Sequence, residues 1–459
     1  MYFVTIFAIL WKKKNYCQER RQQLRRRNME NRTIYAAILG LGTVGTGTWK
    51  VLQAQKEEMQ HKLGAVIEVK KILVRNTAKA AAKTGLPELV TDDWEEIVKD
   101  DSIEIVIELM GGLEPARTYI REALEAGKHV VTANKDLIAS DHGHLLDLAK
   151  QKGCDLMFEA AVAGAIPVIL PLKQSLAANH LTEVMGIING TTNFILTKMA
   201  QENMEFADAL ALATKLGYAE ADPTADIEGL DAARKVAILA SIAFNSRVTI
   251  EDVKNEGITK ITANDIRYAK EMGCCIKLIG MAHMAEKGIE AYVAPMLIPE
   301  SHPLAAVNDS YNAVFVRGDA VDNAMFLGRG AGELPTASAV VGDVFEVARN
   351  IVHGCCGRVS CTCYKQLPVV AMEEINSRYF LRVQVEDKIG VLAMLADVFA
   401  QHQVSVEQMI QKRRSGDFAE IVVITARVRE GDFRKAVECI SEKPNVQKVD
   451  SVIRVYGAD

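Results

Sequence analysis

The stretch from Thr33 to Gly45, TIYAAILGLGTVG, sets the architecture of the first part of the chain. Its first seven residues form an apolar run of strand length, and glycines at positions 40, 42 and 45 follow before a helical pattern begins. A strand, a G-x-G-x-x-G turn and a helix form the context in which such glycines bind a dinucleotide. Gly40 permits the tight turn, Gly42 lets the backbone approach the pyrophosphate, and Gly45 allows close helix packing. We therefore predict a Rossmann-type dinucleotide-binding domain.

The second predicted strand runs from Val66 to Val74 and is followed directly by Arg75. An acid at that point would bind a ribose 2′-hydroxyl, whereas an arginine accommodates a 2′-phosphate. Arg75 therefore favours NADP(H), with NAD(H) still open. A solvated surface arginine is the alternative interpretation.

Two further strands are predicted at Ile103–Leu109 and Lys128–Ala133, and Lys135 follows the second of them. Ligands bind at the carboxyl ends of the strands in such sheets. We therefore expect Lys135 to point toward the ligand crevice, although a solvated lysine at a helix start fits the same pattern.

The stretch Gly217–Phe244, GYAEADPTADIEGLDAARKVAILASIAF, reads as an acidic loop followed by a buried helix. Asp231 and Lys235 lie four residues apart in the first turns of that helix, so they share one face. A lysine held there by a carboxylate can exchange a proton with a substrate oxygen. The alternative is an ordinary surface salt bridge.

Residues 155–162 are predicted to form a strand that leads into small residues, with Glu159 near its end. A carboxylate followed by accessible carbonyl groups suits a hard cation, and tight packing of small residues explains the pattern equally well. The strand that starts at Val184 ends in a polar turn at residues 189–193, and Asn193 is expected to begin a helix. We expect the polar groups of this turn to face a small polar substrate.

Five ordered motifs together resemble homoserine dehydrogenase: GLGTVG, TANK at 132–135, EAAVAGAIP, GIINGTTNF and GYAEADPTADIEGLDAARK. The resemblance runs from about Ile34 into the 340s. It implies NADPH-dependent reduction of L-aspartate 4-semialdehyde to L-homoserine, a step in threonine, methionine and isoleucine biosynthesis. It also implies roles for individual residues: Lys235 as proton donor, Lys135 at substrate and cofactor, Glu220 and Asp231 at the substrate, Leu41, Thr43, Val44, Gly217 and Gly332 at NADP, and Glu159 with the backbone of Val162, Gly164 and Ile166 around a sodium ion.

The C-terminal part, Arg378 to Tyr456, follows a predicted linker at 364–372 and has the βαββαβ order of a ferredoxin-like fold. With its strand, turn and helix around Asp387–Gly390, it resembles an ACT domain, a regulatory module that binds small ligands. We expect an amino-acid effector, threonine, near Lys388–Val391, and a module separable from the catalytic regions. A plain dimerisation module is the alternative.

The expected fold class is α/β, and the chain divides into five parts. Residues 1–28 are expected to be a basic leader that is disordered or not native, with a short membrane-surface anchor as the alternative. A Rossmann-type domain at 29–160, an α+β catalytic and dimerisation domain at 161–352, a linker at 353–377 and the ACT domain at 378–459 follow. We expect a homodimer or homotetramer.

Composition restricts the class of partner. Residues 1–28 carry eight basic side chains and one acid, so the net charge of −5 leaves −12 for the remainder. An acidic remainder argues against nucleic-acid binding, and no apolar run is long enough to span a membrane. Nine cysteines without an even-spaced framework favour a reducing, cytoplasmic compartment. The group His353, Cys355, Cys356, Cys361 and Cys363 matches no standard zinc spacing, so we interpret it as a structural linker.

Two other classes of protein fit parts of the pattern. A different dehydrogenase with an ACT module, such as a 2-hydroxy-acid type, needs a histidine paired with a carboxylate. We expect no such pair at the candidates His129, His142, His144 and His180. A non-catalytic amino-acid sensor has no use for a proton donor, which Lys235 supplies.

Overall fold

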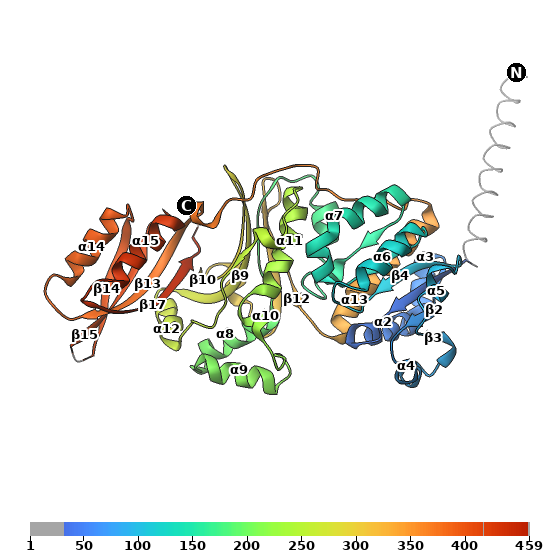
Figure 1. Cartoon of the computed structure of the whole chain (residues 1–459), viewed down its shortest axis with the longest axis horizontal. Coiled ribbons are helices and arrows are strands. Elements are labelled where there is room, and N and C mark those ends of the chain that lie inside the picture. Colours follow the sequence, from blue (N-terminus) through green and yellow to red (C-terminus); the bar gives the residue numbers. More distant parts are fainter. Residues whose placement is uncertain (1–31, 416, 458–459) are drawn as a thin grey trace, which may run out of the picture. The chain divides into compact units, whose positions relative to one another are not determined.

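The structure is a computed structural model that describes residues 32–415 and 417–457 of the 459-residue chain. The predicted leader, residues 1–28, lies outside the described residues. The chain forms two compact units (Figure 1). Of the described residues, the first unit comprises 32–137, 141–160 and 332–361, and the second comprises 138–140, 161–331, 362–415 and 417–457.

The first unit is built on a six-stranded parallel sheet with the order β3-β2-β1-β4-β5-β6. This is the strand order of a Rossmann fold, as predicted. Its strands are β1 Thr33–Leu39, β2 Val66–Leu73, β3 Val90–Thr91, β4 Ile103–Glu108, β5 His129–Thr132 and β6 Leu156–Met157. Its helices are α2 Thr43–Ala54, α3 Lys56–Leu63, α4 Thr77–Thr84, α5 Glu95–Val98, α6 Ala116–Glu125, α7 Lys135–Lys152 and α13 Glu333–His353.

Helix α13 joins this unit from far along the chain. Its buried Val340, Val344 and Val347 share one apolar core with β1 and α2. Gly47 of α2 approaches α13 so closely that a Cβ would lie 2.5 Å from Glu333 O. The expected boundary at residue 352 groups this helix with the catalytic domain, whereas it packs in the nucleotide-binding unit.

The second unit contains one mixed sheet, with the order β12-β11-β7-β9-β10-β17-β13-β15-β14 and two short strands off this path. Its first seven strands are β7 Leu181–Ile187, β8 Lys254–Asn255, β9 Cys274–Ala285, β10 Gly288–Pro299, β11 Tyr311–Gly318, β12 Asp322–Arg329 and β13 Asn376–Glu386. The others are β14 Val406–Ser415, β15 Phe418–Thr425, β16 Val428–Arg429 and β17 Val446–Val455.

The helices of the second unit include the predicted buried helix, which is α11 and packs against β9 and β10. They are α8 Gly190–Glu202, α9 Phe206–Lys215, α10 Thr224–Ile227, α11 Leu230–Phe244, α12 Ala263–Glu271, α14 Val391–Gln401 and α15 Glu430–Ser441.

Two local expectations are wrong. The strand predicted at 155–162 is only β6, because a 3-10 turn follows at Glu159–Ala161 and Ala163 and Gly164 both have a φ of 57°. Helix α8 begins at Gly190 rather than at Asn193, since the Asn189 side chain accepts a hydrogen bond from Thr192 N and caps the helix.

The C-terminal module, residues 376–457, has the predicted βαββαβ order and its own apolar core. The module was expected to be separable from the catalytic regions, but it shares a sheet with them. Strand β17 pairs in parallel with β10 at Met296↔Arg454 and Leu297↔Val455, so the sheet of the module continues the catalytic sheet. Removing the module would expose the edge of β10.

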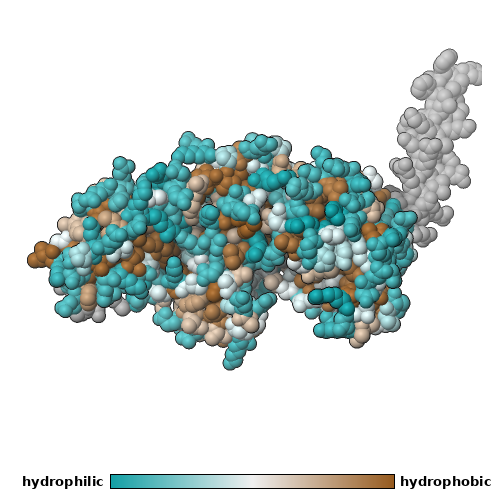
Figure 2. Space-filling model, viewed as in Figure 1, coloured by the Kyte–Doolittle hydropathy of each residue, from teal (hydrophilic) through white to brown (hydrophobic). Residues whose placement is uncertain are grey.

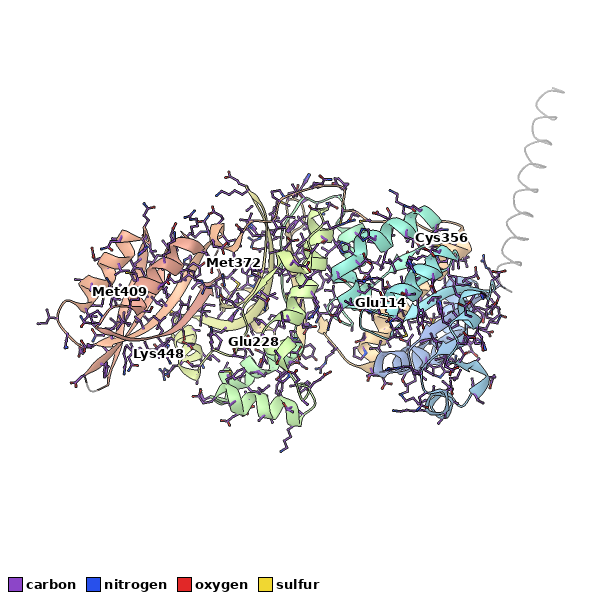
Figure 3. All side chains as sticks on the ribbon, in the orientation of Figure 1. Glu114, Glu228, Cys356, Met372, Met409 and Lys448 are labelled. Carbon is purple, nitrogen blue, oxygen red and sulfur yellow. The ribbon has the colours of Figure 1, made fainter. Side chains whose placement is uncertain are left out.

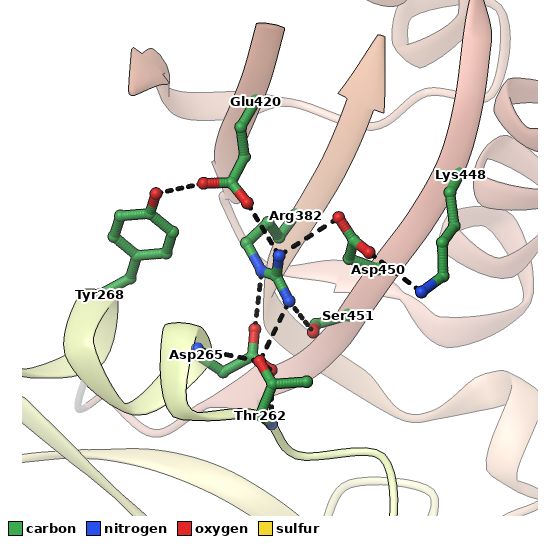
Figure 4. A network of polar contacts seen from close by, with 8 residues as sticks. All are labelled: Thr262, Asp265, Tyr268, Arg382, Glu420, Lys448, Asp450 and Ser451. Carbon is green, nitrogen blue, oxygen red and sulfur yellow. Dashed lines mark hydrogen bonds and ion pairs between the residues drawn. The ribbon is translucent and has the colours of Figure 1, made fainter. Parts of the chain in front are cut away.

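Arg382 holds this junction together (Figure 4). Its side chain is 4% exposed, and its Nε donates to Asp265 Oδ1 of α12 at 2.9 Å. The same guanidinium donates to Thr262 of the catalytic part and to Glu420, Asp450 and Ser451 of the module. One buried cation thus satisfies oxygen acceptors on both sides of the junction.

The face seen in Figure 2 carries apolar residues in small groups among hydrophilic ones. Within residues 32–415 and 417–457, no helix combines the length and the apolar character needed to cross a membrane.

Arg382→Met is expected to lower the stability of the second unit by about 3–5 kcal/mol, because it leaves buried carboxylates without a cation. Chemical denaturation of the full chain measures the loss. The matched control is Lys448→Met, which removes an exposed partner of Asp450 and should change stability by about 0.5 kcal/mol or less. Equal effects of the two variants would show that the buried network does not stabilise the junction.

Candidate active site

Helix α11 starts at a glycine that the local packing requires. Gly229 precedes the helix with a φ of 80°, in the left-handed region that L side chains rarely adopt. A Cβ at this position would lie 3.1 Å from Val293 Cγ1 of β10. The start of α11 is therefore fixed against the sheet, and with it the first turns that carry Asp231 and Lys235.

Lys235 is buried, and its ammonium group is held by two oxygens. Its Nζ lies 2.7 Å from Asp231 Oδ2 and 2.7 Å from Ile188 O, at the end of β7. The side chains of Lys235 and Asp231 are only 10% and 7% exposed. This excludes the alternative of a surface salt bridge.

Asn189 links this pair to the acidic loop. Its Nδ2 donates to Asp231 Oδ2 at 2.9 Å and to Asp226 Oδ1 at 2.7 Å. The hydroxyl of Thr191 donates to Tyr218 O, which ties the turn after β7 to the loop before α10. The polar turn that contains Asn189 was expected to face the substrate, whereas Asp226 was not among the predicted site residues. In the sequence, an asparagine followed by glycine at the end of a strand predicts a helix cap. It does not predict that the asparagine donates hydrogen bonds to two aspartates.

The remaining predicted substrate residues have different surroundings. Glu220 is exposed on the loop between α9 and α10, and Gly217 of the same loop has a φ of 79°. Figure 3 labels Glu228, at the end of this acidic stretch. Lys135 belongs to the first unit, where it starts α7 directly after Asn134, whose side chain caps that helix.

Four of the predicted nucleotide residues line a cavity of about 770 Å³ in the first unit, whereas Thr43, Val44, Gly45, Lys135, Gly217 and Gly332 are not among its lining residues. Gly40, Leu41 and Gly42 border it after β1, and exposed Arg75 borders it after β2. Thr43 and Val44 form the first turn of α2, where main-chain N–H groups point to a bound anion. The turn, the helix start and the arginine together fit a dinucleotide.

Two further basic groups at this cavity were not predicted. Lys79 and Lys83 lie on α4, one turn apart, and both border the cavity beside Arg75. Lys83 Nζ donates to Leu41 O at 3.1 Å. Their four-residue spacing after Arg75 was the available signal, because it places both on one face of the helix.

The proposed sodium ligands belong to different units. Glu159 is buried in the first unit, and its N–H donates to Asp343 Oδ2 at 2.8 Å. Val162, Gly164 and Ile166 lie in the second unit, where left-handed backbone at Ala163 and Gly164 turns the chain sharply. A carboxylate with main-chain carbonyls is a donor set that fits a hard cation. Gly332, with a φ of 127°, precedes α13 in the first unit.

One residue of the cysteine-rich segment lies in a small group of potential metal-binding side chains. Cys356, labelled in Figure 3, lies with His129 and Asp155 in a group whose ligand atoms are within 4.8 Å of one another. However, Asp155 accepts from Gly357 N and Asn350 Nδ2, and His129 Nδ1 accepts from Asp155 N. Burial, then Asp155, raises the pKa of the Cys356 thiol to about 11. His129 and Asp155 of this group thus have hydrogen-bond partners within the chain.

The expectation of no histidine–carboxylate pair is wrong in part. His144 lies 2.7 Å from Asp141 and His180 lies 2.8 Å from Asp319, but the two histidine side chains are 85% and 87% exposed. His129 lies 3.9 Å from Asp155 in the packed group described above. Surface pairs do not form a catalytic acid–base site.

Comparisons with known proteins agree with the dinucleotide-binding fold of the first unit. The family model for the homoserine dehydrogenase catalytic domain matches residues 167–345, its NAD-binding domain matches 40–159, and the ACT domain matches 379–445. A homoserine dehydrogenase of Corynebacterium glutamicum is 47% identical over 425 residues, covering 91% of this chain and 95% of its own.

Solved structures agree with the sequence relatives. A homoserine dehydrogenase from Thiobacillus denitrificans has a TM-score of 0.88 at 42% identity, covering 93% of this chain and 99% of its own. A hyperthermophilic archaeal homoserine dehydrogenase mutant in complex with NADPH has a TM-score of 0.59 at 26% identity, covering 69% of this chain and 97% of its own.

Two glycines of the turn after β1 allow a matched test. A Cβ on Gly45 would lie 2.1 Å from Gly40 O, so Gly45→Ala should lower the thermal stability of the first unit. No described atom lies within 4 Å of a Cβ on Gly42, so Gly42→Ala should fold normally yet bind the dinucleotide weakly. Thermal unfolding and NADPH titration measure the two effects. Normal NADPH affinity in Gly42→Ala would show that the pyrophosphate does not approach this backbone.

Proposed function

The chain belongs to the homoserine dehydrogenase family, and from this premise we propose which of its residues carry the reaction. The protein is an NAD(P)-dependent oxidoreductase that interconverts L-aspartate 4-semialdehyde and L-homoserine. The observation that carries the residue assignment is the buried Lys235, held by Asp231 on a helix fixed against the sheet. A non-catalytic sensor is not favoured by the family match.

The proposed mechanism centres on one proton. A bound nicotinamide cofactor supplies the hydride to the aldehyde carbon. Reduction leaves a developing alkoxide, and Lys235 Nζ donates its proton to that oxygen. Asp231, itself held by Asn189, orients the ammonium group and stabilises its charge. The low exposure of this pair limits competing exchange with water.

Lys235→Ala is expected to lower kcat by about 10²–10⁴, the usual contribution of general acid catalysis, with cofactor affinity nearly unchanged. Steady-state oxidation of NADPH with the aldehyde measures turnover, and cofactor titration measures binding. The control Lys215→Ala changes an exposed lysine of α9 in the same unit and should keep full activity. Turnover near the wild-type value in Lys235→Ala would remove this residue from the role of proton donor.

The proposed substrate contacts also rest on the pairing of opposite charges. We propose that exposed Glu220 binds the substrate amino group and that Asp231 contacts the substrate from the base of the site. Lys135 assists at the substrate and the cofactor from the start of α7. A carboxylate suits an ammonium group because a charge-assisted hydrogen bond is stronger than a neutral one.

We also propose a preference for NADP(H) and a structural sodium ion. Arg75, Lys79 and Lys83 place three positive charges beside one cavity, which suits the additional charge of a 2′-phosphate. Sodium would be held by Glu159 and the main-chain carbonyls of Val162, Gly164 and Ile166.

Arg75→Ala is expected to raise the KM for NADPH far more than the KM for NADH. Only NADPH loses a charge-assisted contact, worth about 1.5–3 kcal/mol. The control is Arg121→Ala, an exposed arginine of α6, which should affect neither cofactor. Equal effects of Arg75→Ala on the two cofactors would show that it does not bind the phosphate.

The C-terminal module carries the proposed regulation, with threonine as effector and a homodimer or homotetramer as the assembly. Gly390 starts α14 with a φ of 92°, and no described atom lies within 4 Å of a Cβ placed on it. The neighbouring Ile389 is fully exposed. A ligand can therefore approach the backbone between Lys388 and Val391.

Millimolar threonine is expected to inhibit the full-length enzyme, and Gly390→Asn should remove the inhibition without changing basal turnover. Asparagine tolerates the left-handed backbone but adds a side chain where the effector approaches. Gly273→Asn is the matched control at another open glycine, with a φ of 68°. If neither threonine nor any other amino acid of the pathway changes the rate, the module is an assembly element only.

A further inference from the structure

A second cavity, of about 350 Å³, lies in the second unit on the face of the sheet opposite α11. Gly280 of β9 and Val293 of β10 face α11, since Val236 Cγ2 lies 2.6 Å from a Cβ on Gly280 and Val293 packs against Gly229. Side chains alternate along a strand. The next residues, Met281 and Tyr292, therefore point the other way, and both line this cavity.

The cavity is located at the junction of the two parts of the sheet. Its walls come from β9 and β10 of the catalytic part and from residues 376–378 and 455–457 of the C-terminal module. The pairing of β10 with β17 lies beside it. A ligand in this cavity would therefore contact both parts at once.

The wall of the cavity carries charges of both signs. Glu183, Glu290, Arg317, Arg378 and Arg427 line it. Arg317 is already engaged: its Nη1 lies 3.9 Å from Glu183 Oε1, and its Nε donates to Asn323. Glu183 also accepts from Tyr456 OH at 2.9 Å. Part of the charge is thus neutralised within the wall.

Arg378 provides the most specific feature. One end of its guanidinium pairs with Glu407, but its Nε is buried and has no hydrogen-bond partner within the part of the chain that the structure describes. A buried donor without an acceptor is costly. The acceptor that fits the planar fork of a guanidinium best is a carboxylate.

Glu290 provides the opposite charge. Its side chain is mostly buried, and its Oε2 lies 3.4 Å from Nδ1 of His283, the residue across from it on β9. A carboxylate there suits an ammonium group and disfavours a phosphate or a dicarboxylate. Met281, Met296 and Tyr292 supply an apolar surface between the charged groups. The size of the cavity is within the range of small-molecule sites.

We propose that this cavity binds a free α-amino acid, with its carboxylate on Arg378 and its ammonium group on Glu290. This site is distinct from the effector contact proposed at Lys388–Val391. Amino-acid binding at this site can be measured directly, and the rate of the dehydrogenase reaction is only a second measurement of it.

Strand β10 connects this cavity to the catalytic helix. Tyr292 lines the cavity, and Val293, the next residue, packs on the other face against Gly229, from which α11 begins. Asn255 pairs with Val293 and donates to Glu228 O at 2.7 Å, just before that glycine. A ligand that shifts β10 would therefore move the start of α11, and occupancy of the cavity is expected to alter turnover.

Isothermal titration of the full-length, cofactor-free protein with each of the twenty common L-amino acids tests the proposal. At least one is expected to bind saturably. Its amide, which lacks the carboxylate, and its N-acetyl derivative, which lacks the ammonium group, should each bind about tenfold or more weaker. The absence of binding by every amino acid, or equal binding of the derivatives, overturns the proposal.

Variants locate the site. Arg378→Gln and Glu290→Gln should each raise the Kd about tenfold or more. Glu407→Gln, which removes only the partner of Arg378, should retain binding, as should Gly390→Asn. Loss of binding in Gly390→Asn, or unchanged binding in both Arg378→Gln and Glu290→Gln, would assign the ligand to another site and overturn the proposal.

Two control measurements distinguish a loss of amino-acid binding from misfolding and from a loss of catalysis. Thermal unfolding without ligand shows whether each variant folds, and if Arg378→Gln is unstable, Glu290→Gln decides. Basal oxidation of NADPH, measured without amino acid, reports the proposed catalytic residues independently, because neither Arg378 nor Glu290 belongs to them.

Discussion

The structure depends on keeping one ammonium group charged inside a protein core. An isolated buried charge is very costly, and it is tolerated when it is paired and hydrogen-bonded. Lys235 meets this condition through Asp231 on its own helix and Ile188 O at the end of β7. These partners come from distant segments, so the turn after β7 and the start of α11 must be held at fixed positions.

The surrounding elements meet that requirement by close backbone contact. Gly229 fits against Val293, and a Cβ on Gly257 would lie 2.2 Å from Ile227 O, at the end of α10. Asn189 donates to Asp231 Oδ2, the same oxygen that Lys235 contacts. Each position accepts only a small residue or a specific hydrogen-bonding group. The catalytic geometry is therefore a consequence of how the acidic loop and α11 pack on β10.

Sequence patterns predicted those parts of the fold that depend on neighbours in the chain. The GLGTVG turn, the helix of Lys235 and the βαββαβ order are local, because each follows from spacing within one strand–turn–helix unit. The position of α13 and the pairing of β10 with β17 join segments far apart in sequence, and no local pattern specifies them. Arg382 illustrates the limit, since an arginine in an alternating strand predicts a solvated face, yet its carboxylate partners make it a buried residue.

The junction between β10 and β17 explains why two arginines are buried there. Only two residue pairs define the parallel pairing, which gives the backbone little means to fix the register. Arg454 is 1% exposed and donates to Glu256 of the catalytic part and Glu430 of the module. A slip by one residue between β10 and β17 would turn its side chain to the opposite face of the catalytic sheet and leave Glu256 without it. Apolar residues would pack as well at either register, whereas a buried charge accepts only one. We infer that Arg382 and Arg454 fix how the module joins the catalytic sheet, so that any ligand bound at the junction acts on a single defined geometry.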